Sequence, residues 1–381
     1  MSNFRTVIIF CSLIFLVSCG EENPSGEGLS NRGVTDDEII LGSFSDLSGP
    51  VAVWGVGSVN GARMRFAEVN EAGGVHGRQI RFVVEDTSYQ VPKAISAANK
   101  LINRDNVLAM LLGVGTPMNN ALMPTLFEAG VPNFFPISGG RQMDEPFHRF
   151  KFSQHGIYYD EARASVKYFM EQLGSEVPCV IHIDNDYGIE ILAGAKDQAE
   201  AMGTSLSAVS AHKPTESEFT APIIRLRKAG CDLVLMGTVH RDTILILAAA
   251  RKMGWSDVAW VGTNAAYAQV IADQESSEGY YCFVHMAKIY SDDEMSPIVR
   301  SWWDKYIELY GAEPGLAAME GYRGADLTVE ALQRAGRDIT TDGLVKAMES
   351  IDSYKDIFGY NVSFSADSHK GATESVLSQV R

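Results

Sequence analysis

Two short polar turns follow neighbouring apolar segments of this chain, and both could hold an anionic or carbonyl group. Thr116 comes after the apolar run 107–112, and Pro117 suits the first position of a helix. Ser138 follows the next apolar run, 131–135. Because parallel strands end at one sheet edge, where helix N-termini offer unpaired N–H groups, the two turns should converge on one crevice. Helix capping and turn formation explain the same residues without a ligand, so both interpretations stay open.

A third candidate for ligand contact is Trp54, which lies in the glycine-rich stretch 46–58. We predict a long loop there, between a strand at 39–44 and a helix that Gly73 ends. A solvated loop does not need a large apolar ring, which favours a role for Trp54 in binding. The alternative is an indole that packs against its own loop.

The residue patterns that catalysis or metal binding requires are missing from the sequence. It has no GxSxG, HxxxH, HExxH or CxxC pattern. The glycines at 55, 57 and 61 have GxGxxxG spacing, which is not the dinucleotide fingerprint. Isolated histidines such as His182 and His240 are more often structural than functional. We therefore expect no enzyme activity, no cofactor and no metal site.

Length and charge limit the possible architectures and partners. At 381 residues the chain is too long for one ordinary core, so two lobes are expected. The net charge of −16 argues against nucleic acid or an anionic membrane surface as a partner. The net charge does not determine the charge of a small ligand, because the local electrostatic potential in a cleft can have the opposite sign to the net charge of the protein.

The first residues have the pattern of a targeting segment. Arg5 precedes an apolar run at 7–16, and the letters LVSC at its end resemble a bacterial lipobox. This predicts a signal peptide at 1–18 and lipidation of Cys19; an ordinary signal peptide with an incidental cysteine is the alternative. Residues 19–35 are then a solvated tether. No later run of about 18 apolar residues follows, so we expect the rest of the chain to be soluble, with the lipid as its contact with the membrane.

Strand and helix patterns alternate for most of the length, and the alternation restarts after residue 153. This rhythm is typical of α/β folds in which helices cover both faces of a parallel sheet. The sequence therefore predicts two doubly wound lobes.

The segment 36–86 contains a characteristic series of glycines and other residues, which are Gly49, Pro50, Ala52, Trp54, Gly55, Gly61, Ala62, Asn70, Ala72, Gly73, Gly74, Gly77, Arg78, Ile80 and Asp86. In these residues it resembles the opening of the type I periplasmic binding proteins of the leucine/isoleucine/valine-binding family. Arg65 departs from the family pattern, which has Ala there.

The resemblance implies that the chain crosses between the lobes three times, near Phe152, Cys282 and Tyr360. Three short crossings form a hinge on which lobes can close. The lobes would then comprise 36–152 with 283–359, and 153–282 with 360–381.

The resemblance also implies roles for individual side chains. Trp54 matches an aromatic residue that covers the ligand, and Asp242 an acid that pairs with a ligand ammonium. Asp242 could equally stabilise the start of a helix. Thr116 and Ser138 match family positions that hold a ligand carboxylate. Tyr158 and Tyr187 match aromatic residues of the family's pocket.

One departure from the family predicts a reshaped pocket. In a register through Tyr322, Ala317 and Met319 stand where branched-chain binders have Phe and Trp. A ligand other than leucine then becomes plausible. The sequence does not decide whether Glu320 faces this pocket or solvent.

The family implies an extracytoplasmic, lipid-anchored solute-binding protein. It would bind a branched-chain or other hydrophobic amino acid, or a related small carboxylate or amide, in the cleft between the lobes and deliver it to an ABC permease. A sensory protein that binds a small amide or aromatic acid is the alternative function. An enzyme acting on small amides or esters is a more distant one, because we find no nucleophile with a base partner.

The cysteines after the signal segment are Cys179, Cys231 and Cys282, an odd number. Cys179 and Cys231 each open an apolar run. We expect buried free thiols, with a disulfide as the alternative.

Overall fold

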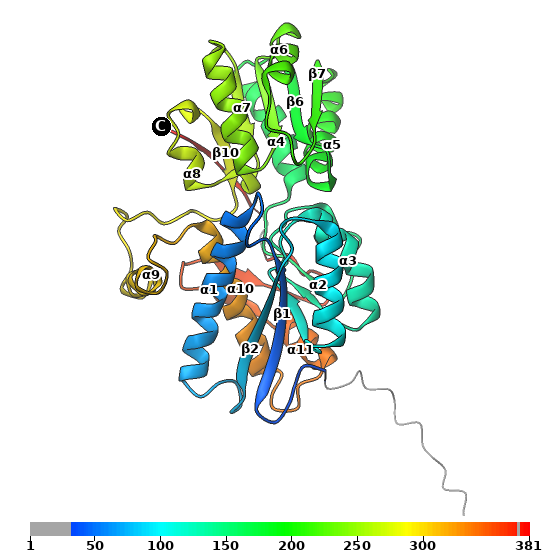
Figure 1. Ribbon diagram of the computed structural model, residues 1–381, viewed down its shortest axis with the longest axis vertical. Helices are drawn as coiled ribbons and strands as arrows, with labels where there is room; N and C mark the ends of the chain where they lie inside the picture. The colour runs from blue at the N-terminus through cyan, green and yellow to red at the C-terminus, as the bar shows by residue number, and fades with distance from the viewer. Residues whose placement is uncertain (1–31, 372–373) are drawn as a thin grey trace, which may run out of the picture.

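The computed structural model describes residues 32–371 and 374–381. The described chain forms two α/β lobes stacked along the long axis of the molecule, as Figure 1 shows. The predicted signal peptide, residues 19–31 of the predicted tether and the lipidation of Cys19 lie outside the described residues.

The first lobe has a parallel sheet with the strand order β2-β1-β3-β4-β5. Helices α1 and α10 cover one face and α2 and α3 the other (Figure 1). The elements are β1 (Glu38–Ser45), α1 (Ala52–Glu71), β2 (Gln79–Asp86), α2 (Val91–Asn103), β3 (Ala109–Leu111), α3 (Thr116–Glu128), β4 (Asn133–Phe134), β5 (Lys151–Phe152), α9 (Pro297–Tyr310), α10 (Leu316–Arg334), α11 (Thr341–Glu349), β11 (Asp352–Lys355) and β12 (Asn361–Ser363).

The second lobe has the sheet β13-β10-β9-β8-β6-β7, parallel except for its edge strand β13. Helices α4 and α5 pack on one face, and α6 and α7 on the other. The elements are α4 (Tyr158–Gln172), β6 (Pro178–Ile183), α5 (Asp186–Ala201), β7 (Ala208–His212), α6 (Thr220–Lys228), β8 (Leu233–Gly237), α7 (His240–Lys252), β9 (Ala259–Gly262), α8 (Gln269–Ala272), β10 (Tyr281–Val284) and β13 (Val376–Gln379).

The chain passes between the sheets after β5, after β10 and between β12 and β13. Two of the predicted lobe boundaries fall elsewhere in the structure. The predicted first-lobe segment 283–359 begins inside β10, a strand of the second sheet. The start of the predicted second-lobe segment 360–381 packs on the first lobe instead. It contains β12, which pairs with β11, and the ring centre of Phe364 lies 5.5 Å from that of Phe152. These boundaries depend on pairing and packing with segments distant in the sequence, which the local sequence pattern does not predict.

The stretch 46–58 is not the long loop that its glycines predict. Helix α1 begins at Ala52, so Trp54 lies in its first turn. The two oxygens of Asp46 accept the N–H groups of Gly49 (2.6 Å) and Val51 (2.8 Å) and thereby close the turn before the helix. The glycines serve packing instead, because a Cβ on Gly57 would lie only 2.8 Å from the Cβ of Ala317.

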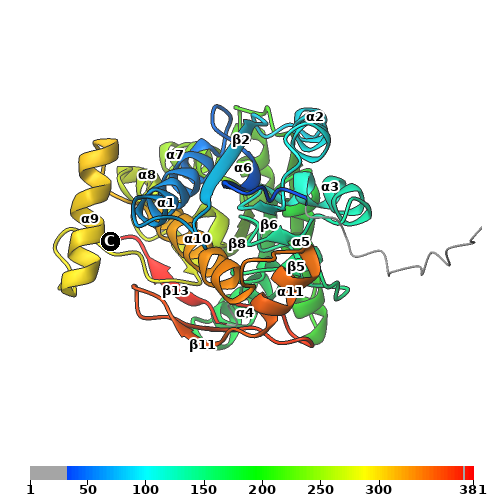
Figure 2. The same cartoon turned by 90° about the horizontal axis from the view of Figure 1, so that it is seen from below.

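Helices α1 and α10 therefore approach each other closely, and Figures 1 and 2 both show them side by side. Arg65, which departs from the family pattern, has a partner across this contact. Its Nε lies 2.6 Å from Oδ1 of Asp326, and both side chains are largely buried. The ion pair fixes the position of one helix along the other.

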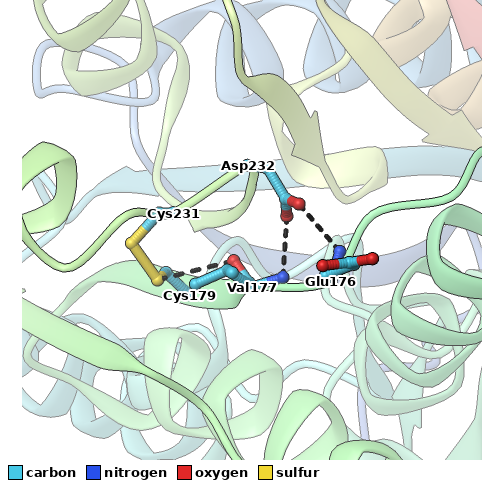
Figure 3. The surroundings of a disulfide bond; sticks show 5 residues. All are labelled: Glu176, Val177, Cys179, Cys231 and Asp232. Carbon is cyan, nitrogen blue, oxygen red and sulfur yellow. Dashed lines mark hydrogen bonds between the residues drawn. A yellow bond between two sulfur atoms is a disulfide. The ribbon is translucent and has the colours of Figure 1, made fainter.

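The expectation of free thiols at Cys179 and Cys231 is wrong. The two residues form a disulfide and their Cα atoms lie 5.9 Å apart (Figure 3). Cys179 is in β6, and Cys231 precedes the neighbouring strand β8. Their separation of 52 positions hides this proximity in the sequence. Cys282 is a buried free thiol.

We expect reduction of this disulfide to lower the free energy of unfolding by about 2–4 kcal/mol, because the bond restricts the unfolded chain. Urea unfolding with and without a reductant, followed by tryptophan fluorescence, measures the change. A Cys179→Ala/Cys231→Ala double variant is the control and should not respond to the reductant. Equal stability of the reduced and oxidised wild type would contradict the prediction.

Candidate functional site

A small cavity lies between the lobes, where the carboxyl ends of strands from both sheets face each other. Its volume is about 30 Å³, enough for roughly one or two water molecules. Ligand pockets for organic molecules are usually about 300–1,000 Å³. The cleft is therefore closed, and the lobes must move apart to admit a solute.

Trp54 forms one wall of the cavity and joins the two lobes. Its side chain comes from the first turn of α1, and its Nε1 donates a hydrogen bond to the carbonyl of Ala265 in the second lobe, at 3.0 Å. The indole is buried. An aromatic wall is thus held in place by the opposite lobe.

Thr116 lines the cavity, and Ser138 lies directly behind it. Their hydroxyl oxygens are 2.8 Å apart, and both side chains are buried. The capping interpretation of Thr116 is wrong, because Gly115 occupies the N-cap position with φ 97° and the Thr116 hydroxyl is paired with Ser138 instead. The structure therefore brings together the two hydroxyls that the sequence places after separate strands.

Tyr158 and Tyr187 line the opposite side of the cavity. Their rings meet edge to face with centroids 4.9 Å apart. The Tyr187 hydroxyl donates to the carbonyl of Thr238 at 3.1 Å, which fixes the ring. The N–H of Tyr158 donates to the carbonyl of Gly139 in the first lobe at 2.9 Å. Both tyrosines are thus rigid aromatic surfaces.

Asp242 is not part of the cavity wall. It is fully buried in the first turn of α7, and its Oδ1 accepts from Nη2 of Arg241 at 2.6 Å. His212 is a second neighbour, with Nε2 4.0 Å from Oδ2, and burial lowers the pKa of its ring. The carboxylate is therefore held by a guanidinium of its own helix.

Sequence reasoning missed several residues of the wall. They are Tyr89, His155 and the aliphatic residues Val51, Val114, Ile137, Val239 and Ala265. The aliphatic residues carry no signal that separates them from core. His155 does, because it lies three residues after the predicted crossing at Phe152.

A buried cluster of charge-bearing side chains lies at the crossings beside the cavity. Nε2 of His155 is 2.6 Å from one carboxylate oxygen of Glu320, and Nε2 of His285 is 3.1 Å from the other. All three side chains are at most 1% exposed. His155 and His285 come from the first and second crossings, and Glu320 from α10. The cluster ties both crossings to the first lobe.

The hydrogen bonds around His155 determine its protonation. Nδ2 of Asn264 donates to the carbonyl of Gly156 (3.0 Å) and to Glu161 (2.8 Å), so its Oδ1 must face Nδ1 of His155 at 3.3 Å. Nδ1 therefore carries a hydrogen. Nε2 faces the Glu320 carboxylate, which raises the pKa of the ring and so favours its protonated form.

These three residues also form a set that could hold a metal ion, with ligand atoms within 4.8 Å of one another. Two ligands of one tetrahedral zinc ion would lie about 3.4 Å apart, given bonds of about 2.1 Å. The 2.6 Å separation between His155 and Glu320 is that of a charge-assisted hydrogen bond. The geometry thus indicates an ion pair.

Burial and charge act in opposite directions on this cluster. Burial disfavours the carboxylate of Glu320, but His155 and His285 outweigh it and lower the Glu320 pKa to about 2. Burial opposes charge on His155, yet Glu320 and the hydrogen bonds raise its pKa. Burial has the largest effect on His285 and lowers the pKa of that ring, although Glu320 acts in the opposite direction.

A family model described as "Periplasmic binding protein" matches residues 38–381. The chain belongs to this family. Among curated relatives of this binding protein is the leucine-, isoleucine-, valine-, threonine- and alanine-binding protein of Pseudomonas aeruginosa, 23% identical over 313 residues, which cover 81% of this chain and 82% of the relative. Another is Leu/Ile/Val-binding protein homolog 8 of Brucella abortus, 24% identical over 344 residues, which cover 86% of this chain and 84% of that one. The family predicted from the sequence is confirmed.

Solved structures show the same fold. A fatty acid ABC transporter substrate-binding protein from Thermomonospora curvata has a TM-score of 0.80 at 24% identity, covering 93% of this chain and 94% of that chain. A solute-binding protein from R. palustris in complex with benzoate has a TM-score of 0.78 at 18% identity, covering 90% and 93%. These matches confirm the predicted bilobal α/β fold.

Members of the periplasmic binding protein family bind substrates and are in general not enzymes. Within residues 32–371 and 374–381, none of the helices has the length and hydropathy needed to cross a membrane.

The ion pair between His155 and Glu320 predicts a pH dependence of stability. The pKa of His155 is raised on folding, so its contribution is complete below about pH 6.5 and is lost as pH rises through the higher folded value. The contribution of Glu320 is complete above about pH 4.5 and is lost as pH falls towards its folded value.

Glu320→Gln should therefore lower the free energy of unfolding by about 3–5 kcal/mol at neutral pH. It should also weaken the dependence of that free energy on pH on both the acid and the alkaline side. Urea unfolding between pH 3 and pH 9 measures it, with the wild type and Glu278→Gln, an exposed glutamate, as references. If the free energies of unfolding of Glu320→Gln and the wild type change with pH in the same way, the ion pair is excluded.

Proposed function

We propose that this periplasmic binding protein is the solute-binding component of an ABC-type uptake system, and that its solute has an apolar body and a carboxylate or amide head. The observation that carries the proposal is the composition of the interlobe cavity. Aromatic and aliphatic side chains form most of its wall, and Thr116 supplies a hydroxyl beside the start of α3. Such a wall suits a small organic molecule with one polar group.

The polar group of the solute would bind at the start of α3. Because the hydroxyls of Thr116 and Ser138 are paired, Ser138 can donate to Thr116, and Thr116, which lines the cavity, can donate its own hydrogen to a ligand oxygen. The positive end of the helix dipole favours a negative charge there. Trp54 would cover the apolar part from the first lobe, with Tyr158 and Tyr187 against it from the second. The contacts with both lobes would stabilise the closed form that a permease recognises.

The charges near the cavity favour a solute without an ammonium group. Among the described residues of its wall, none is an aspartate, glutamate, lysine or arginine. Asp242 is paired with Arg241, and Glu320 with His155. A bound amino acid would leave its ammonium without a carboxylate in the wall of the cavity, which is costly in a closed cleft. A small carboxylate or amide therefore fits better than a branched-chain amino acid.

The remaining parts of the proposal come from the sequence. We infer that the chain is cleaved before Cys19, carries lipid on that residue and acts outside the cytoplasm. Its partners would be the solute and the membrane subunits of the transporter, and not nucleic acid. Catalysis is not part of the proposal.

A thermal and urea unfolding screen tests the solute class. We expect aliphatic or aromatic monocarboxylates, or their amides, to stabilise the protein by about 2.7 kcal/mol at 100 times their dissociation constant. Leucine and isoleucine at the same concentration should stabilise it less, because their ammonium has no partner. Stronger stabilisation by the amino acids than by any acid or amide would refute the solute class.

Variants of the cavity wall test the site with the solute found in that screen. Trp54→Ala and Thr116→Val should each weaken its binding roughly tenfold or more, because one loses an apolar wall and the other a hydrogen bond to the head group. Isothermal titration calorimetry measures the affinities, with the exposed Ser217→Ala as the control. Asp242→Asn should change the affinity by less than about twofold, because Asp242 does not line the cavity. Unchanged affinity in both wall variants would place the site elsewhere.

A further inference from the structure

An ion pair joins the two lobes on the side of the cleft where α3 faces α5 (Figure 1). Arg141, which lies between β4 and β5 of the first lobe, meets Glu190 of α5 in the second. Its Nε donates to one carboxylate oxygen at 2.8 Å and its Nη2 to the other at 3.3 Å. This two-point contact is the strong form of an arginine–carboxylate pair.

The first lobe supplies the hydrogen bonds of the Glu190 carboxylate. Nε2 of Gln142 donates to it at 2.8 Å, in addition to the guanidinium of Arg141. Within residues 32–371 and 374–381, every hydrogen bond to this carboxylate comes from Arg141 or Gln142. The side chain of Glu190 is only 4% exposed, so the carboxylate depends on these partners. Separation of the lobes would break all of these bonds, and the pair therefore belongs to the closed form.

Further contacts on the same side connect the first lobe with α4 and α5. The guanidinium carbon of Arg141 lies 3.8 Å from the ring centre of Tyr159, a cation–π contact. The Tyr159 hydroxyl donates to Asp197 at 2.7 Å, which holds the ring in place. Nδ2 of Asn120 in α3 donates to Asp186 in α5, also at 2.7 Å. The second lobe thus presents both a carboxylate and an aromatic ring to Arg141.

The segment 138–142 carries both this ion pair and part of the proposed solute site. The hydroxyl of Ser138, at its start, is paired with that of Thr116 at 2.8 Å. The next carbonyl, of Gly139, accepts the N–H of Tyr158 from the second lobe at 2.9 Å. Five consecutive residues therefore connect the proposed head-group site with the opposite lobe, so the position of this lobe affects the hydroxyls at the site.

We propose that Arg141 is a positioning residue for solute binding, because its pair with Glu190 holds the lobes together and determines the fraction of closed molecules. The inference rests on the proposed function, in which the closed cleft binds the head group at Thr116. Arg141 does not line the cavity, so it acts through the position of the lobes and not through contact with the solute. Since apparent affinity is proportional to the fraction of binding-competent molecules, the ion pair raises the affinity for every solute that the cleft accepts.

The distance between the lobes in the protein without solute tests this role. Spin labels on Asn99→Cys in α2 and Lys196→Cys in α5, both at exposed positions, report it by double electron–electron resonance. Arg141→Gln should lower the ratio of closed to open molecules roughly tenfold, because it leaves the carboxylate of Glu190 buried without a charged partner in the closed form only.

Arg149→Gln is the matched control for the distance measurement. It removes the same charge from an exposed ion pair with Asp342 that lies within the first lobe, so the distances should not change. Addition of Glu190→Gln to Arg141→Gln should restore part of the closed population, since the carboxylate that lost its partner is then gone. A purely structural loss would not be reversed by a second substitution.

Calorimetric titration with hexanoate and hexanamide tests the effect on binding. Arg141→Gln should weaken both by the same factor, up to about tenfold, because only the closed fraction changes. A loss confined to hexanoate would mean that the guanidinium acts directly on the carboxylate, which contradicts a positioning role.

The inference is overturned if the wild type without solute has no closed population, or if Arg141→Gln and Arg149→Gln give the same distances. Neither result involves a solute, so the proposed function would stand. If the distances respond as expected but no acid or amide binds to the wild type, the role of Arg141 in closure stands and the proposed function fails.

Discussion

The close contact between α1 and α10 determines the position of most groups discussed above. Gly57 meets Ala317 there, Gly61 meets the backbone of Ala318, and Arg65 pairs with Asp326 further along. Helices pack this closely only where small residues let their backbones approach. The contact orients the first turn of α1, and with it Trp54, towards the second lobe. It also places Glu320 at the crossings.

The buried ion pair at the crossings connects the hinge to this helix pair. A carboxylate without a partner in such a site would be unstable, so Glu320 restricts where His155 and His285 can lie. His155 in turn contacts Asn264 of the second lobe, which Glu161 also holds. The position of one lobe relative to the other therefore depends in part on the contacts of His155.

The wall of the cavity is rigid although the lobes can move. Tyr187 is fixed by Thr238, Thr116 by Ser138, and Trp54 by Ala265. Only the last of these hydrogen bonds crosses between the lobes. The N–H of Tyr158 makes a second hydrogen bond across the lobes, to the carbonyl of Gly139. An opening motion would therefore act on the bonds of Trp54 and Tyr158 and leave the others intact.

The sequence by itself determined the family, the alternation of strands and helices, and the positions of Thr116, Ser138, Tyr158 and Tyr187 at strand ends or helix starts. These features are local, since periodicity and turn chemistry act over a few residues. The tertiary structure decided the disulfide between Cys179 and Cys231, the pairing of Asp242 with Arg241, and the start of α1 at Ala52. It also brought His155, His285 and Glu320 together from distant segments. A pattern in the sequence reports which face a side chain occupies, but only the packed fold sets which distant side chains share that face and how much space remains between them.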